Sequence, residues 1–307
     1  MKLARYIIDG HPTIGVVAGD GLVRISELLP EYQRMIDLAA AGPDALDRLG
    51  DKLASAQPRD ELKSVKLLAP IERPHNFLAI GMNYKKHAEE GVRLGVIPPK
   101  FQVWFNKATS SLSGPYDDID PGVTQQLDYE VELGVVIGAA ARYRSPEEAP
   151  AHVFGYVVAN DVSARDWQLH ASTWAVGKSF ETHGPVGPWI VTPDEIGDPH
   201  QLELRSYVNG ELRQRASTEQ LIYNIWEQIE YISTAFTLEP GDIILTGTPE
   251  GVGHAMIPQQ HLKVGDTVRC EIDRIGAIEN KVVTSTARRI PVLEENRISR
   301  VLAGTQS

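Results

Sequence analysis

The amino-acid sequence predicts an α+β fold in which strands dominate. Short runs of β-branched and aromatic residues recur after Phe77, and most are bounded by Gly, Pro, Asn or Asp. These runs do not alternate regularly with helical segments, so a parallel sheet with a helix after each strand is not expected. The chain has 307 residues, of which 42% are hydrophobic and 23% charged, values typical of a globular protein with a sizeable core.

The first seventy residues are expected to form a small α+β domain of their own. Two apolar runs flank Asp9-Gly10, a dipeptide typical of two-residue hairpin turns. A helical stretch is expected over about 31–56, with a break at Gly42-Pro43. Segment 66–75 contains two prolines and has the composition of a connector. The predicted domains are therefore 1–70 and 71–290.

Two elements of the larger domain have clear patterns. In 267–272, Val268, Cys270 and Ile272 alternate with polar residues, which predicts a strand with one buried face. A long helix is predicted to begin at Ser217, because Ser217 and Gln220 match a capping box and apolar residues follow at helical spacing up to about residue 232. The polar segment 291–307 is expected to be a peripheral tail.

Charge and composition exclude several classes of protein. Thirty Lys and Arg against 41 Asp and Glu give a net charge of −11, which argues against nucleic acid or an anionic membrane as the main partner. A single cysteine, Cys270, excludes a disulfide framework and a cysteine-based metal cluster. The N-terminal segment lacks the pattern of a targeting signal, and no apolar run approaches the roughly 20 residues that cross a bilayer. A cytoplasmic protein without a membrane anchor is expected.

Three acidic residues form a candidate metal site. Glu130 and Glu132 are two residues apart on a predicted strand, so both side chains project from one face, about 6–7 Å apart. Asp161 directly follows another apolar strand, where a side chain leaves the sheet. Three carboxylates without a thiol suit Mg²⁺, Mn²⁺ or Ca²⁺ better than Zn²⁺ or copper. The alternative is a solvated strand face that binds no ion.

A histidine and a glutamate form a candidate general base. His87 and Glu90 are at positions i and i+3 of a segment that can close as a helical turn, so they share a face. The carboxylate can then orient the imidazole and stabilise its protonated form, as activation of water requires. The alternative is a surface helix with an incidental histidine. Glu89 is the neighbour that could be confused with Glu90 as the partner of His87.

Further polar residues follow these segments. Arg165 and Gln168 come shortly after Asp161, and Arg165 could bind a substrate carboxylate in a bidentate fork, or form a structural ion pair, for example with Asp166. Lys178 lies in a weakly polar run and could equally be an ordinary surface lysine. The glycine-rich segment 247–253 lacks the features of a phosphate-binding loop and is expected to be a turn.

Five segments together resemble the fumarylacetoacetate hydrolase family, over about residues 72–285. In chain order they are IGMNYKKHAEE, LDYEVELGVVIG, GYVVANDVSARDWQ, VGKSFETHGPVGPWIVT and IILTGTPEGVG. The resemblance implies a catalytic domain of the β-roll or mixed β-sandwich type, usually a homodimer. It also implies that Mg²⁺ or Mn²⁺ is held by Glu130, Glu132 and Asp161, and that the first seventy residues match the short N-terminal domain of many bacterial members.

The same resemblance assigns roles to other side chains. His87 and Glu90 match the family's catalytic dyad on a mobile lid, and Lys178 matches a ligand for substrate oxygens or a proton donor. Thr248 matches a contact to the substrate carboxylate. Asn83 and Tyr84 are weaker candidates for the pocket lining.

The expected reaction is metal-dependent hydrolysis of a C–C bond in an acylpyruvate or related 2,4-diketo acid. An enolate would form and a keto acid such as pyruvate would be released, in aromatic or sugar-acid catabolism. The alternative is a metal-dependent decarboxylase or isomerase of oxaloacetate or hydroxy-dienedioate-type acids. A third possibility is a non-catalytic module that binds metal or a keto acid. Such a module would be expected to have lost His87, Arg165 or Lys178, and all three are present.

Overall fold

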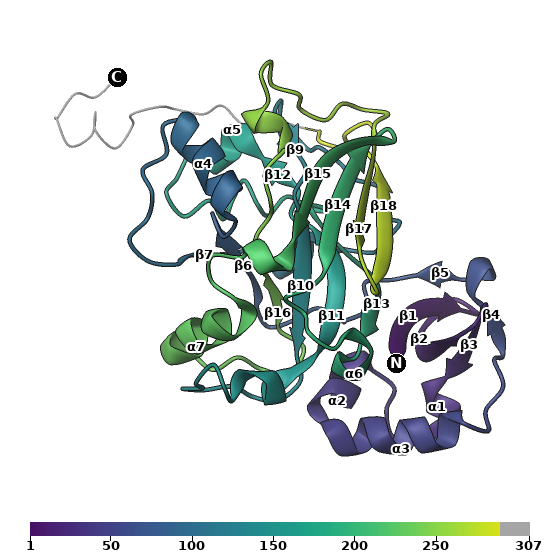
Figure 1. Ribbon diagram of the computed structural model, residues 1–307. Coiled ribbons are helices and arrows are strands. Elements are labelled where there is room, and N and C mark those ends of the chain that lie inside the picture. Colours follow the sequence, from purple (N-terminus) through teal and green to yellow (C-terminus); the bar gives the residue numbers. More distant parts are fainter. Residues whose placement is uncertain (289–307) are drawn as a thin grey trace, which may run out of the picture.

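The centre of the molecule is a twelve-stranded sheet, seen in Figure 1 in a computed structural model that describes residues 1–288. The strands of its main path, in spatial order, are β4 (Asp60–Glu61), β3 (Gly21–Arg24), β2 (His11–Ala18), β1 (Lys2–Ile8), β13 (Gly184–Val191), β11 (Val153–Asn160), β10 (Val131–Ile137), β16 (Ile243–Leu245), β6 (Phe77–Gly81) and β7 (Val103–Asn106). Off this path, β5 (Lys66–Leu67) pairs with β1, and β8 (Leu112–Ser113) pairs with β13. Neighbouring strands are antiparallel except in the pairs β16–β6 and β13–β8.

A second sheet covers one face of the first. Its four antiparallel strands are β15 (Glu211–Ser217), β14 (Glu203–Val208), β17 (Thr267–Ile272) and β18 (Gly276–Lys281). The largest apolar cluster contains Leu133 of β10, Leu204 of β14 and Cys270 of β17, so the core lies between the sheets. Val268, Cys270 and Ile272 are buried, which confirms the predicted one-sided strand. A separate pair is formed by β9 (Leu127–Asp128) and β12 (Ser163–Ala164).

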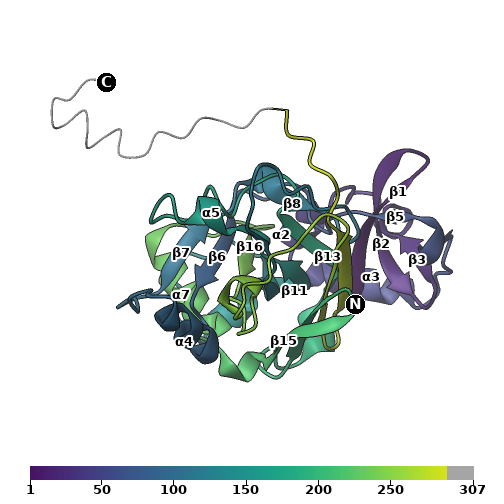
Figure 2. The same cartoon turned by 90° about the horizontal axis from the view of Figure 1, so that it is seen from above.

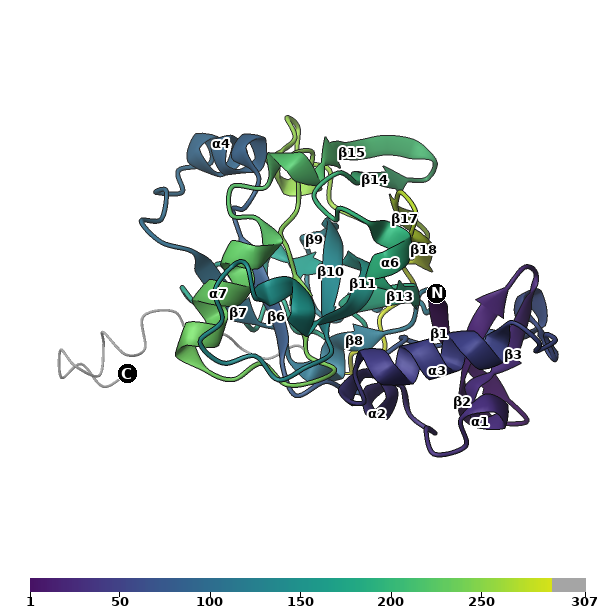
Figure 3. The same ribbon diagram turned by 60° about the horizontal axis from the view of Figure 1, so that its bottom comes forward.

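Short helices surround the sheets. The α-helices are α1 (Ile25–Leu28), α2 (Met35–Ala40), α3 (Pro43–Leu53), α4 (Lys85–Arg93), α5 (Arg165–Gln168), α6 (Pro193–Ile196) and α7 (Ile225–Ala235). The 3₁₀ turns are η1 (Leu62–Ser64), η2 (Thr109–Ser111), η3 (Ala149–His152), η4 (Thr218–Gln220) and η5 (Gly253–Ala255). Figure 3 shows α2 and α3 at one end of the molecule and α4 at the other. None of these helices combines the length and apolar character needed to span a membrane.

The N-terminal region forms a lobe at the end of the main sheet (Figure 2). Asp9 and Gly10 both have positive φ, 49° and 79°, and join β1 to β2, which confirms the predicted hairpin turn. The expected helical stretch is also found, divided into α2 and α3 at Gly42. The sheet continues from Leu3 of β1 to Ile190 of β13, and one apolar cluster contains side chains from both sides of residue 70. The division into domains 1–70 and 71–290 stays a prediction.

The predicted start of the long helix at Ser217 is wrong. Helix α7 begins at Ile225, where the Asn224 side chain caps the helix and Glu227 completes the capping box. Ser217 instead accepts a hydrogen bond from the backbone of Glu219 in η4. Residues 221 and 222 instead pair with the backbone of residues 83–84, and Tyr223 bonds to the side chain of Asn83. The predicted tail, 291–307, lies outside the described residues.

One buried ion pair joins the strands of the N-terminal lobe. The carboxylate of Asp60 accepts hydrogen bonds from Arg24 at 2.6 and 2.7 Å and from the Tyr6 hydroxyl at 2.8 Å. Its bonds to Arg24, and then to Tyr6, lower the pKa of Asp60 although burial opposes this. Because its pKa is lower in the folded state, the stability that Asp60 contributes is present above its unfolded pKa, about 4, and is lost as the pH falls below it.

We therefore expect Asp60→Asn to lower the free energy of unfolding by about 1–3 kcal/mol at pH 7. Urea unfolding at pH 7 and at about pH 3 measures this, and the difference from the unmodified protein should shrink at the lower pH. Asp20→Asn, in the exposed β2–β3 turn, is the matched control. An equal loss of stability at both pH values would contradict the ion-pair explanation.

Candidate active site

Three buried carboxylates meet where β10 begins and β11 ends. Glu130 directly precedes β10, Glu132 lies in it, and Asp161 directly follows β11. Because the strands are antiparallel and Val131 pairs with Asn160, these two strand ends lie side by side. One ligand oxygen from each carboxylate lies within 4.8 Å of the others. The side chains are buried, with residue exposures of 4%, 1% and 0%, so the alternative of a solvated strand face is wrong.

The three carboxylates repel one another. Burial and the neighbouring Asp161 and Glu130 raise the pKa of Glu132 well above its usual range. One backbone amide, that of Gly247, donates to Glu132 Oε2 at 2.7 Å and offsets part of this cost. A divalent cation would offset more, and oxygen donors alone are the set that Mg²⁺ and Mn²⁺ prefer. The residues present therefore fit such an ion.

Two buried lysines contact the carboxylates. Lys178 Nζ donates to Glu130 Oε2 and Asp161 Oδ2, both at 2.6 Å, so the alternative of a surface lysine is wrong. Lys107 donates to Asp161 Oδ1 at 2.6 Å and to the backbone carbonyl of Lys178. Sequence reasoning missed Lys107, although it directly follows strand β7, the same kind of position that identified Asp161.

The guanidinium group of Arg165 forms hydrogen bonds within the protein. Its Nε donates to Asp128 at 2.9 Å, one terminal nitrogen donates to Glu130 at 2.6 Å, and the other donates to Gln168 at 3.0 Å. Its ion pairs are thus with Asp128, which sequence reasoning missed, and Glu130. The suggested partner Asp166 instead accepts hydrogen bonds from residues 124 and 125. Burial alone would raise the pKa of Glu130, but Arg165 and Lys178 outweigh it and lower that pKa.

The histidine–glutamate pair lies on helix α4. His87 Nδ1 is 3.1 Å from Glu90 Oε2, and Glu90 is only 8% exposed, whereas Glu89 is exposed. The other carboxylate oxygen of Glu90 accepts a hydrogen bond of 3.0 Å from the backbone amide of Gly251. The 247–253 turn therefore holds Glu90, and through it the imidazole of His87, in a fixed position.

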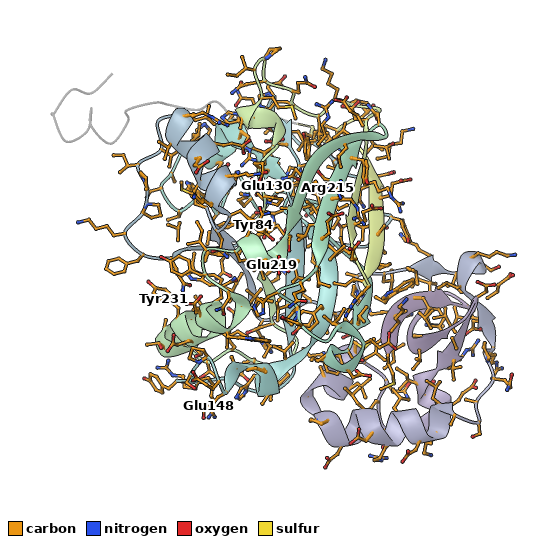
Figure 4. The ribbon with its side chains drawn as sticks, in the orientation of Figure 1. Tyr84, Glu130, Glu148, Arg215, Glu219 and Tyr231 are labelled. Carbon is orange, nitrogen blue, oxygen red and sulfur yellow. The ribbon has the colours of Figure 1, made fainter. Side chains whose placement is uncertain are left out.

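The remaining predicted residues lie around this centre. Thr248 Oγ1 donates to the carbonyl of Val131 at 3.0 Å and accepts from Gln214 Nε2 at 2.8 Å. Tyr84 and Asn83 are fully buried and do not line the cavity. In the view of Figure 4, Glu130 and Tyr84 lie between α4 and β15. The predicted contact of Tyr84 with the substrate stays a prediction.

A single cavity of about 240 Å³ brings these groups together. Its polar lining consists of His87, Glu90, Glu130, Glu132, Arg165, Gln168, Lys178, Thr248 and His254. Apolar side chains from β7 and from the segments after α4 and α5 line much of the remainder, among them Leu94, Phe105, Leu169 and Trp174. The arrangement can hold a metal ion and place a base above it in the same small volume.

Comparison with known proteins identifies relatives of the whole chain. The sequence profile described as fumarylacetoacetate (FAA) hydrolase C-terminal matches residues 76–283. The mitochondrial oxaloacetate tautomerase fahd2 of Xenopus laevis is 43% identical over 291 residues, which cover 92% of this chain and 90% of that protein. Oxaloacetate tautomerase FAHD2A of Homo sapiens is 39% identical over 284 residues, covering 91% and 90%.

Solved structures show the same fold. Maleylpyruvate hydrolase from Sphingobium sp. SYK-6, in complex with manganese(II) and pyruvate, is 32% identical, with a TM-score of 0.78, over 93% of this chain and 100% of that one. Fumarylacetoacetate hydrolase from Exiguobacterium antarcticum is 37% identical, also with a TM-score of 0.78, over 92% and 99%. These matches confirm the predicted β-dominated α+β class. The chain belongs to the fumarylacetoacetate hydrolase family.

Proposed function

We propose that the chain is a divalent-metal-dependent enzyme that moves a proton at C3 of a 2-oxo acid, with the keto–enol tautomerisation of oxaloacetate as its first candidate reaction. The observation that supports this most strongly is the presence of the His87–Glu90 pair and the carboxylates of Glu130 and Glu132 in one cavity. The similarity to oxaloacetate tautomerases over about nine tenths of the chain supports the same reaction.

Glu130, Glu132 and Asp161 are the proposed ligands of Mg²⁺ or Mn²⁺. When bound there, the ion would polarise the 2-oxo group of the substrate and make its C3 hydrogens more acidic. Arg165, Gln168 and Thr248 are the proposed contacts of the substrate carboxylate, because all three line the cavity. Arg165 would have to exchange one of its present hydrogen bonds for the substrate.

The protein supplies the base and the charge that the reaction needs. The imidazole of His87 takes the proton from C3, and Glu90 stabilises the imidazolium that results. Negative charge then develops on the oxygen at C2. The ammonium of Lys178 stabilises that charge, since Asp161 and Glu130 outweigh burial and raise the pKa of Lys178, which keeps it protonated. Return of the proton to oxygen completes the tautomerisation.

Hydrolysis of an acylpyruvate is the second candidate, because the oriented His87–Glu90 pair can also activate a water molecule. In this reaction His87 deprotonates a water, whose oxygen attacks the C4 carbonyl. The C3–C4 bond then breaks, releasing a carboxylic acid and the enolate of pyruvate, which takes up a proton. The similarity of this chain to maleylpyruvate hydrolase also supports hydrolysis.

One assay separates the two candidates. The purified protein with Mg²⁺ or Mn²⁺ is given oxaloacetate or acetylpyruvate, and enol absorbance, pyruvate and CO₂ are followed separately. Tautomerisation changes the enol absorbance without forming pyruvate. Hydrolysis forms pyruvate from acetylpyruvate, and decarboxylation forms CO₂ from oxaloacetate. The absence of all these changes would contradict the proposal.

Replacement of the base should reduce turnover without affecting metal binding. We expect His87→Ala and Glu90→Gln to lower kcat by about 100-fold or more, because the proton acceptor is lost or misoriented. Glu89→Gln, on the exposed side of the same helix, should retain full activity. Calorimetry with Mn²⁺ should give the same Kd for all three variants. Undiminished turnover by His87→Ala would remove His87 as the base.

Loss of one carboxylate should weaken metal binding without destabilising the metal-free protein. Glu132→Gln replaces a carboxyl group whose ionisation is opposed by burial, Asp161 and Glu130, so the melting temperature after chelation should be unchanged or higher. Saturating Mn²⁺ should raise the melting temperature of the unmodified protein clearly and that of the variant little. Thermal unfolding with and without Mn²⁺ measures both effects. An equal Mn²⁺-dependent increase in the variant would exclude Glu132 as a ligand.

Two further properties are proposed from the family resemblance. We propose that the chain forms a homodimer and that it acts in the cytoplasm on a small-molecule keto acid. Light scattering of the purified protein measures the first property, and cell fractionation measures the second. A monomer at micromolar concentration would contradict the proposed assembly.

A further inference from the structure

His254 is a polar residue of the cavity lining for which the proposed reaction has no use. It lies in η5, directly after the 247–253 turn. Its backbone amide donates to Asp128 at 3.0 Å, and the amide of Gly253 donates to the same carboxylate at 2.8 Å. Asp128 also binds Arg165, so His254 is held beside the guanidinium that the proposed function places at the substrate.

The hydrogen bonds of its ring determine which nitrogen of His254 carries the proton. His254 Nδ1 lies 3.1 Å from Nε2 of His261, and the two rings are 5.4 Å apart with an angle of 32° between their planes. The side-chain amide nitrogen of Gln259 lies 3.4 Å from the same Nδ1 and donates to the backbone carbonyl of His254 at 2.9 Å. An amide nitrogen only donates, so Nδ1 is the acceptor. This contact assigns the proton of a neutral His254 to Nε2.

Nε2 is the ring nitrogen that remains available to a ligand in the cavity. His261 and Gln259, which occupy Nδ1, do not belong to the cavity lining, whereas His254 does. Among the hydrogen bonds of residues 1–288, none involves His254 Nε2. Burial, followed by the charge of Arg165, lowers the pKa of His254, which keeps the ring in this neutral form. The cavity lining thus includes an N–H donor that the proposed reaction does not use.

We infer that His254 is a specificity-determining residue whose Nε2–H, beside Arg165, binds the second carboxylate of a 2-oxo dicarboxylic acid. Three features support a carboxylate as the occupant. The donor carries no competing protein acceptor, the positive charge of Arg165 acts at this position, and the neighbouring lining residues Val252 and Ala255 are apolar. The inference rests on the proposed function, because it assigns the 2-oxo acid end of the substrate to Glu130 and Glu132.

A matched pair of ligands tests the inference by binding. 2-Oxoglutarate and 2-oxopentanoate have five carbons each and differ only in a terminal carboxylate or methyl group. Calorimetry of the full chain loaded with Mn²⁺ gives the Kd of each. We expect His254→Leu to weaken 2-oxoglutarate by about tenfold or more and 2-oxopentanoate by less than twofold, because one charge-assisted hydrogen bond is lost.

Two further variants separate the role of the donor from a general effect on folding. His254→Gln keeps an N–H donor and should retain part of the preference for 2-oxoglutarate. His261→Phe removes the hydrogen bond to Nδ1 and should reduce the preference, whereas His261→Gln keeps a donor and should restore it. The melting temperatures of all four variants show whether each is folded.

Different results would overturn different conclusions. If His254→Leu weakens the binding of both ligands equally, or of neither, His254 does not bind a second carboxylate. The inference is then wrong, while the proposed function stands. If the unmodified Mn²⁺-loaded protein binds neither ligand, the proposed 2-oxo acid site is itself contradicted. A turnover assay adds an independent readout, in which His254→Leu should raise the KM for oxaloacetate more than that for acetylpyruvate, with kcat little changed.

Discussion

The mutual repulsion of three buried carboxylates is the constraint on which the active site depends. Glu130, Glu132 and Asp161 would cost several kcal/mol if each were buried alone in its charged form. The structure offsets this cost with the ammonium groups of Lys178 and Lys107, each 2.6 Å from Asp161. The compensation is uneven, since Glu132 contacts neither lysine and its pKa is raised. Protonation of Glu132, which its raised pKa favours, or a bound divalent cation would balance the site.

The sheet positions these charges through the alternation of strand β10. Val131 and Leu133 pack into the core between the two sheets, so Glu130 and Glu132 project from the opposite face. The antiparallel neighbour β11 then delivers Asp161 to the same edge. The backbone therefore determines the ligand geometry, and the carboxylates need little conformational freedom to bind an ion.

One group of cavity residues would carry out the chemistry that the candidate reactions share, and a different group would select the substrate. The carboxylates, Lys178 and the His87–Glu90 pair would serve tautomerisation, decarboxylation or hydrolysis equally, since each of these passes through an enolate or its equivalent. What differs is the group attached to C3 of the substrate and whether water reaches it. We propose that the lining residues outside this shared set, His254 and the apolar side chains after α4 and α5, select the substrate.

The sequence by itself determined the features that depend on neighbouring residues. Local features could be predicted from strand, turn and helix geometry alone. They are the alternation around Glu130 and Glu132, the turn at Asp9-Gly10 and the i, i+3 spacing of His87 and Glu90. Only the tertiary structure decided which distant side chains meet. Asp128 lies 37 positions from Arg165, and Lys107 lies 54 positions from Asp161, so neither pair leaves a periodic signal. Long-range contacts also decide where α7 begins, because residues 221 and 222 pair with the backbone of residues 83–84 instead of closing a helical turn.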